Sequence, residues 1–173
     1  EEVKDQIVDL VGCSREEIRL LFGNMGELIA LHRKMQKEME GGRRDVPDLF
    51  KEYTPLMDVY CTYVRNLPRA MRLLEMLQTR SRFRSFVAAR LEEVAKAHHH
   101  IRGDGGAITY LPSYLILPVQ KIPRYVLLLE ELSKAVQVLQ AFQGDTARIT
   151  VAVKGIKEVA RRMNEEALLA EEY

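Results

Sequence analysis

LPSYLILPVQKIPRYVLLLEEL, residues 111–132, is an almost continuously apolar run. A helix over about residues 112–139 would be apolar nearly all round, and such a helix normally packs at the centre of a protein. Pro118 and Pro123 each remove one backbone hydrogen bond inside it, at a cost of about 3 kcal/mol or more. The sequence therefore predicts a central helix that is kinked and is held by its neighbours.

The segment upstream also shows helical spacing. Ser14 and Glu17 form a capping box, in which each side chain accepts a hydrogen bond from the backbone N–H of the other residue. The sequence predicts one helix from Ser14 to the GGRR turn at 41–44. One face of it is predicted to be apolar, through Ile18, Leu21, Phe22, Met25, Leu28, Ile29 and Met35.

Prolines, glycines and apolar spacing predict how the rest of the chain is divided into helices. A second helix runs from Pro47 to a break at Pro68, and a third runs from there to the histidines at 98–100. Glycines mark a turn at 102–108, and a last helix begins near Asp145. Alternating β patterns are nearly absent, so the predicted fold class is all-α.

The composition is typical of one globular domain. The 173 residues include 26 Lys and Arg and 25 Asp and Glu, a formal net charge of +1. No net field therefore directs the chain to nucleic acid or to acidic membranes. Cys13 and Cys61 lack zinc or CxxC spacing, no apolar run is long enough to span a membrane, and the start is not a signal peptide. We expect reduced thiols and a cytoplasmic protein.

A polar stripe interrupts the apolar run. Ile116, Gln120 and Arg124 are spaced by four residues and therefore share one side of the helix. Spacing alone leaves two interpretations open. The stripe is either the solvated side of a core helix, or a surface on a rigid element that binds flexible loops of a partner.

The same run resembles the third conserved region of Dbl-homology domains, the exchange domains that act on Rho-type GTPases. That region reads Leu-Ile-x-Pro-x-Gln-basic-Ile-Pro-basic-Tyr and continues into three leucines and Glu-Leu. Weaker similarities follow in the order of the family at 18–32, 50–66 and 156–165. The resemblance covers most of the chain, and residues 1–173 are expected to form a single Dbl-homology domain.

The resemblance implies an elongated helical bundle that is a guanine-nucleotide exchange factor. Its partner would be a Rho-family small GTPase of the Rac, Rho or Cdc type, and a pleckstrin-homology domain usually follows in the family. Such a factor makes no covalent change, and no cofactor or metal is expected. It remodels the two switch loops of the GTPase, so that Mg²⁺ is expelled and GDP leaves. Membrane contact would come only indirectly, through neighbouring domains.

The resemblance also assigns site residues. Gln120 and Arg124 match the Gln and the basic residue that meet the second switch. Asn164 matches an Asn near the end of the last helix, where Asn fits a contact role, with a solvated side chain as the alternative. Ile116 matches a position that abuts the GTPase and helps to choose the partner. The face of Asn164 is extended at helical spacing by Leu168 and Glu171.

One feature of the family is not found. Family members open with a Thr-Glu pair three residues before an aromatic residue, and that Glu contacts the first switch. Here Val3, Lys4 and Asp5 match the residues just after such a motif, and no Thr-Glu precedes them. The start of the first helix is therefore expected to be missing from this chain.

Two other classes of protein compete with this interpretation. A helical scaffold explains the periodicity but leaves PVQKIPRY unexplained. A lipid-binding bundle predicts a strongly basic net charge, which is absent, although it would explain Arg80, Arg82, Arg84 and Arg90.

The histidines at 98–100 also suggest a metal site. Their side chains point about 100° apart, however, which favours a role at a helix C-terminus.

Overall fold

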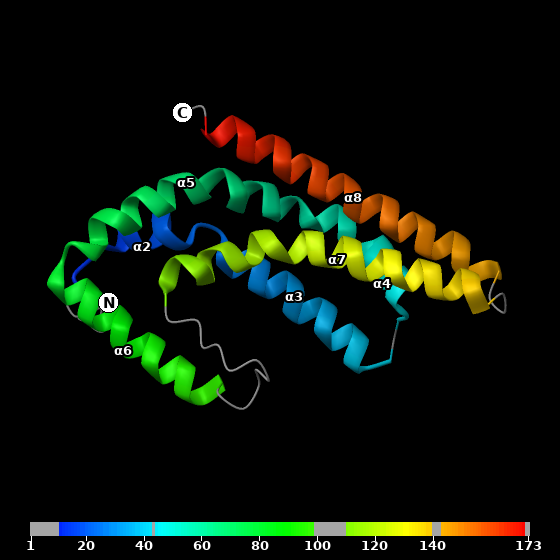
Figure 1. The fold of residues 1–173 in the computed structure, drawn as a ribbon, viewed down its shortest axis with the longest axis horizontal. Helices are drawn as coiled ribbons and strands as arrows, with labels where there is room; N and C mark the ends of the chain where they lie inside the picture. The colour runs from blue at the N-terminus through cyan, green and yellow to red at the C-terminus, as the bar shows by residue number, and fades with distance from the viewer. Residues whose placement is uncertain (1–10, 43, 99–109, 140–142, 172–173) are drawn as a thin grey trace. The chain divides into compact units, whose positions relative to one another are not determined.

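The computed structural model describes residues 11–42, 44–98, 110–139 and 143–171. These residues form helices and no strand, so the predicted all-α class is confirmed (Figure 1). The 102–108 turn, His99 and His100 lie outside the described residues, as does the chain before residue 11. The elements are α2 (Arg15–Phe22), α3 (Met25–Glu40), α4 (Val46–Tyr53), the 3-10 helix η1 (Thr54–Asp58), α5 (Val59–Gln78), α6 (Ser81–His98), α7 (Leu111–Leu139) and α8 (Gln143–Glu171).

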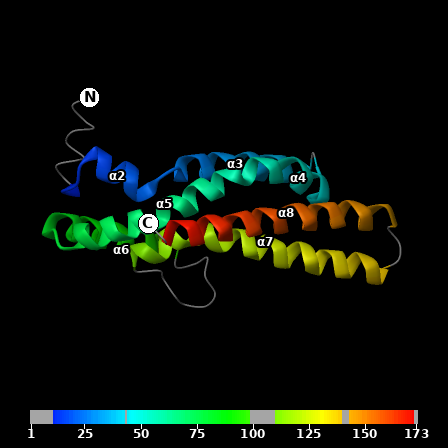
Figure 2. The ribbon, with the colours of Figure 1, turned by 90° about the horizontal axis from the view of Figure 1, so that it is seen from above.

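The chain divides into two compact units. The first consists of residues 1–23 and 66–117, and the second of residues 24–65 and 118–173. The second unit holds α3, α4, η1, the first turns of α5, most of α7 and all of α8. Within it, α8 packs mainly against α4 and η1. The last part of α7 runs beside the first part of α8 in the opposite direction, as both ribbon views show (Figures 1 and 2).

The helix predicted from Ser14 to the 41–44 turn is broken in two at Gly23. Its capping box is confirmed, with Ser14 Oγ accepting from Glu17 N at 3.1 Å, and α3 ends at Glu40 as expected. Gly23 has a φ of +51°, and a Cβ there would lie 2.9 Å from Asn66 Nδ2. Asn66 Nδ2 also donates to Leu20 O at 2.7 Å and thereby caps the end of α2. The break therefore depends on a residue far away in the sequence.

The break has a consequence for the predicted apolar face. Leu21, Leu28 and Met35 are buried, as expected. Phe22 and Ile29 are exposed, which is a second correction to that prediction. A face drawn over one continuous helix no longer holds once the backbone changes direction at Gly23.

The helix predicted from Pro47 to Pro68 is also divided differently. α4 ends at Tyr53 and gives way to η1, because Pro55 has no N–H to donate in an α-helical bond. Thr54 donates to Phe50 O with both its backbone N–H and its Oγ1, the latter at 2.5 Å. Pro68 does not end a helix but lies inside α5, which stops only at Gln78. Burial of the residues that follow Pro68 outweighs the single missing bond, and these are Ala70, Leu73, Leu74 and Leu77.

α7 is continuous through Pro118 and Pro123, as predicted, but it is not buried all round. Leu115, Ile122 and Leu129, each seven residues from the next, are at most 2% exposed. Leu127 and Leu128 are 62% and 65% exposed. α7 is therefore buried along one face and exposed along the other, so it is less enclosed than its apolar composition predicted. None of the described helices combines the length and apolarity needed to cross a membrane.

Candidate functional site

The outer face of α7 carries the polar stripe. Gln120 and Arg124 are both exposed, and Arg124 Nη2 donates to Gln120 Oε1 over a long 3.4 Å. Ile116, 39% exposed, lies on the part of α7 that belongs to the first unit. A hydrogen bond of this length and exposure holds the guanidinium only weakly. The amide of Gln120 and the guanidinium of Arg124 are therefore accessible to another molecule.

Leu127 adds an apolar contact to this face and was missed by the sequence analysis. It follows Gln120 by seven residues, about two helical turns, and so lies on the same side of α7. No signal in the sequence pointed to it, because only the fold shows that Leu115, Ile122 and Leu129 form the buried stripe and leave Leu127 outside. Exposed leucines beside exposed polar groups are typical of the surfaces at which proteins bind each other.

α8 exposes two of its three predicted site residues. Asn164 and Leu168 are exposed, and Leu168 to 65%. The core stripe of α8 runs through Ile156, Val159 and Met163, so Asn164 lies at its edge. Glu171 is the last residue of α8, and its side chain lies outside the described part of the chain.

An ion pair sets the register of α7 against α8. Lys157 Nζ lies 2.5 Å from Glu130 Oε1, and the ammonium lowers the pKa of the Glu130 carboxyl. Asn164 follows Lys157 by two turns and therefore shares the α7-facing flank of α8.

The rise per residue then places the site residues at matching heights. At 1.5 Å per residue, Arg124 lies about 9 Å along α7 from Glu130, and Asn164 about 10 Å along α8 from Lys157. Gln120 and Leu168 lie about 15 and 16 Å along in the same direction, because the helices are antiparallel. By this estimate, Gln120, Arg124, Asn164 and Leu168 lie at similar heights along the two helices.

The opposite side of α8 forms ion pairs with other residues of the second unit. Arg65 binds Glu166 through two bonds of 2.7 Å and lowers the pKa of that carboxyl. Arg162 pairs with Asp58 of η1. Gly155 lets η1 approach, because a Cβ there would lie 3.1 Å from Thr54 Cγ2. Exposed ion pairs stabilise little individually, but together they fix which side of α8 faces outward.

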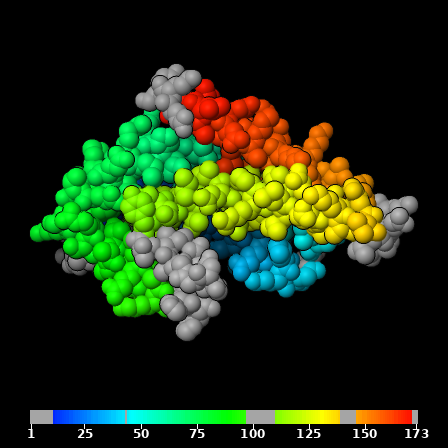
Figure 3. Space-filling model, in the orientation of Figure 1, coloured from blue at the N-terminus to red at the C-terminus, as the bar shows by residue number. Residues whose placement is uncertain are grey.

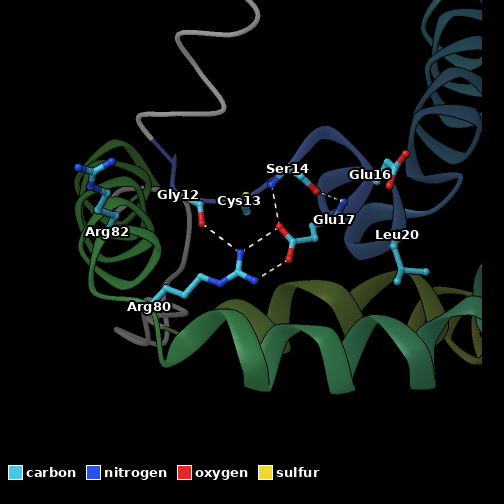
Figure 4. A pocket seen from close by; sticks show the side chains of 8 residues that line it. All are labelled: Gly12, Cys13, Ser14, Glu16, Glu17, Leu20, Arg80 and Arg82. Carbon is cyan, nitrogen blue, oxygen red and sulfur yellow. Dashed lines mark hydrogen bonds and ion pairs between the residues drawn. The ribbon is translucent and has the colours of Figure 1, made fainter.

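The candidate surface is exposed, and the first unit separately contains a cavity. The face of α7 turned to the viewer is open in the space-filling view (Figure 3). A cavity of about 720 Å³ lies elsewhere, in the first unit, between Arg80 and the start of α2. Two of its ionic groups satisfy each other, since Arg80 binds Glu17 at 2.7 and 3.0 Å, and Arg80 also donates to Gly12 O at 3.2 Å (Figure 4). Among the described residues, no group of three His, Cys, Asp or Glu side chains could hold a metal ion.

The cavity in the first unit holds a carboxyl group with a strongly lowered pKa. Hydrogen bonds from Arg80, and then from the backbone of Ser14, lower the pKa of Glu17 to about 2. Cys13, which lines the same cavity, is buried, and burial raises the pKa of its thiol. A thiol held in its neutral form is a poor nucleophile, so the cavity offers a structural ion pair and not a reactive group.

Comparisons with known proteins identify the family. The RhoGEF domain family matches residues 3–164. The chain is 31% identical over 147 residues to the dynamin-binding protein of Rattus norvegicus, covering 84% of this chain and 9% of that protein. It is 25% identical over 179 residues to the Rho guanine nucleotide exchange factor TIAM2 of Homo sapiens, covering 92% of this chain and 10% of that protein. The chain thus spans about a tenth of the length of these relatives.

A solved structure agrees on the fold. The chain is similar to the Vav1 exchange factor, in a structure concerned with its PH and C1 domains, with a TM-score of 0.70 and 21% identity. The match covers 95% of this chain and 46% of that one. The Dbl-homology fold expected from the sequence is confirmed, and with the family match over residues 3–164 the chain belongs to the RhoGEF domain family.

Proposed function

We propose that this chain is the exchange domain of a longer protein and releases GDP from a Rho-family GTPase by binding it on the surface formed by α7 and α8. The match to the RhoGEF family over residues 3–164 supports the activity. The exposed stripe of α7 level with Asn164 and Leu168 of α8 is the observation that supports the surface. A pleckstrin-homology domain elsewhere in the longer protein remains a prediction, as does recruitment to membranes.

In this mechanism, the GTPase gains contacts with the chain and loses contacts with Mg²⁺ and GDP. Binding to the α7–α8 surface favours a conformation of the GTPase switch loops that no longer holds Mg²⁺ and the phosphates of GDP. No covalent bond forms or breaks, and the chain needs no cofactor. Arg124 supplies a planar, permanently charged group for a carboxylate or carbonyl of the second switch. Gln120 and Asn164 supply neutral donors and acceptors, and Ile116, Leu127 and Leu168 supply apolar contacts.

Fluorescent-GDP release tests this proposal on a panel of Rac-, Rho- and Cdc-type GTPases. The wild-type chain should accelerate release from at least one of them. The double variant Gln120→Ala, Arg124→Ala should lower that rate by about 30-fold or more, because truncating a charged partner in an interface costs about 2 kcal/mol or more. Its thermal melt should match the wild type, since both residues are exposed.

A matched control uses Gln137→Ala with Arg82→Ala, two exposed residues of the same types away from the surface. This pair should exchange like the wild type. Normal exchange by a well-folded Gln120→Ala, Arg124→Ala variant would disprove the assignment of the surface. Absence of release from every GTPase by the wild type would disprove the activity of this chain.

A further inference from the structure

A hydrogen-bonded cluster lies beneath the candidate surface, on the inner side of α7. His32 of α3 contacts Tyr60 of α5 through Nε2, 2.5 Å from the hydroxyl oxygen. Its Nδ1 lies 3.3 Å from the hydroxyl of Tyr125 on α7. All three residues belong to the second unit. One imidazole thus joins three helices of that unit.

The cluster is packed as well as hydrogen-bonded. The His32 ring lies edge-on to Tyr60, with centroids 5.9 Å apart, and Tyr125 meets Phe50 of α4 edge-on at 5.1 Å. Lys121 Nζ lies over the Tyr125 ring, 5.2 Å from its centroid. Tyr125 is therefore fixed by a hydrogen bond at its tip and by ring contacts along its sides.

A neutral imidazole suits this position. One ring nitrogen donates and the other accepts, and a tyrosine hydroxyl can do either. Burial, and then the charge of Lys121, lower the pKa of His32, so the ring is uncharged at neutral pH. Because each ring nitrogen contacts a tyrosine hydroxyl, the orientation of the His32 ring is fixed, and the ring in turn restrains the side chain of Tyr125.

The segment of α7 that carries the site needs such support. Pro118 and Pro123 have no N–H, so the carbonyls of Tyr114 and Val119 lack their usual helical donors. The two prolines flank Gln120 and precede Arg124. The backbone there is held less by its own helix and more by contacts from neighbouring helices. Tyr125, directly after Arg124, makes several of those contacts.

We propose that His32 is a positioning residue for nucleotide exchange, which holds Tyr125 and thereby orients Gln120 and Arg124 toward the GTPase. His32 does not touch the partner itself. This inference rests on the proposed function, since the orientation of Gln120 and Arg124 matters for exchange only if they bind the GTPase. It adds a residue of α3, outside the α7–α8 surface, to the parts of the chain that determine the exchange rate.

The test compares Tyr125→Phe and His32→Phe with Tyr53→Phe. Tyr53 is a control of the same residue type: it is buried, whereas Tyr125 is half-buried, and Tyr53→Phe removes a bond of 2.8 Å to Glu38 that does not involve α7. Tyr125→Phe and His32→Phe should each slow GDP release by about five- to tenfold, the equivalent of one hydrogen bond in the alignment of the site. Tyr53→Phe should melt at a similarly reduced temperature but exchange normally.

Two further measurements separate positioning from general stability. The double variant His32→Phe, Tyr125→Phe should release GDP no more slowly than the worse single variant, because each single change already removes the hydrogen bond between His32 and Tyr125. Hydrogen–deuterium exchange of the free chain should show faster amide exchange over residues 119–129 in Tyr125→Phe than in Tyr53→Phe. This second readout needs no GTPase.

The outcomes are distinct. If Tyr125→Phe and His32→Phe show the same GDP-release rate and the same amide protection as Tyr53→Phe, the positioning role is overturned. GDP release that slows in strict proportion to lost thermal stability would overturn it too. If the wild-type chain releases no GDP but the amides of α7 still lose protection only in Tyr125→Phe and His32→Phe, then the support of α7 by His32 stands and the proposed function fails.

Discussion

The inner and outer faces of α7 come from one mostly apolar stretch of sequence, yet they differ in burial and in polar content. The inner face buries Ile122 and Leu129 and anchors Tyr125 through His32. The outer face exposes Leu127 beside Gln120 and Arg124. An apolar side chain inside stabilises the fold, whereas the same side chain outside offers area to a partner. Mutations on the two faces should therefore act on different measurements.

The largest effect is expected on the inner face. Ile122 is fully buried, so Ile122→Ala should lower the free energy of unfolding by about 2 to 5 kcal/mol, the usual cost of a large-to-small change in a core. Urea denaturation measures it directly. A loss below about 0.5 kcal/mol, the range for surface positions, would show that the inner face is not the packed one.

The matching change on the outer face is Leu127→Ala. Because Leu127 is 62% exposed, its removal should change the free energy of unfolding by no more than about 0.5 kcal/mol. GDP release should slow by about tenfold, since burying a leucine against a partner contributes about 1.5 to 3 kcal/mol. Unchanged GDP release would show that Leu127 does not contact the GTPase. Of the residues assigned to the surface on this half of α7, only Gln120 and Arg124 would then remain.

The smallest effect concerns the pH dependence of the inner face. Burial lowers the pKa of His32, so the unfolded chain takes up a proton near pH 6.5 while the folded chain resists it. The stability contributed by neutral His32 is therefore fully present above about pH 6.5 and is lost as the pH falls toward the lower folded pKa. The groups facing the ring are Tyr60, Tyr125 and Lys121.

Urea midpoints between about pH 7.5 and pH 5, a range in which histidine titrates, check this prediction. The wild type should lose stability on acidification more steeply than His32→Phe, which has no ring to protonate. Parallel curves for the two proteins would mean that the His32 environment does not disfavour its charge.

The sequence predicted the parts of this fold that depend on near neighbours. The capping box of Ser14 and Glu17 and the helical course of 111–139 follow from residues within a few turns of each other. The break at Gly23 could not be predicted in the same way, because it is completed by Asn66 on another helix. The path of α5 through Pro68 likewise depends on which residues become buried, a tertiary effect that outweighs local propensity.

The candidate site divides in the same manner. The spacing of Ile116, Gln120 and Arg124 was sufficient to put them on one stripe. The exposure of Leu127 was hidden, because an apolar run does not show which of its faces meets a neighbour. The level of Asn164 with Arg124 depends on the pair between Lys157 and Glu130, residues that only the folded chain brings together.

The central claim, that α7 and α8 form the surface for a GTPase, is tested most directly by a binding footprint. Amide hydrogen–deuterium exchange of the chain is compared with and without a nucleotide-free Rho-family GTPase that it activates. Protection should appear over residues 116–128 of α7 and 161–169 of α8, while residues 82–96 of α6 keep their free exchange rates. Protection on α6 with none on α7 and α8 would contradict the account.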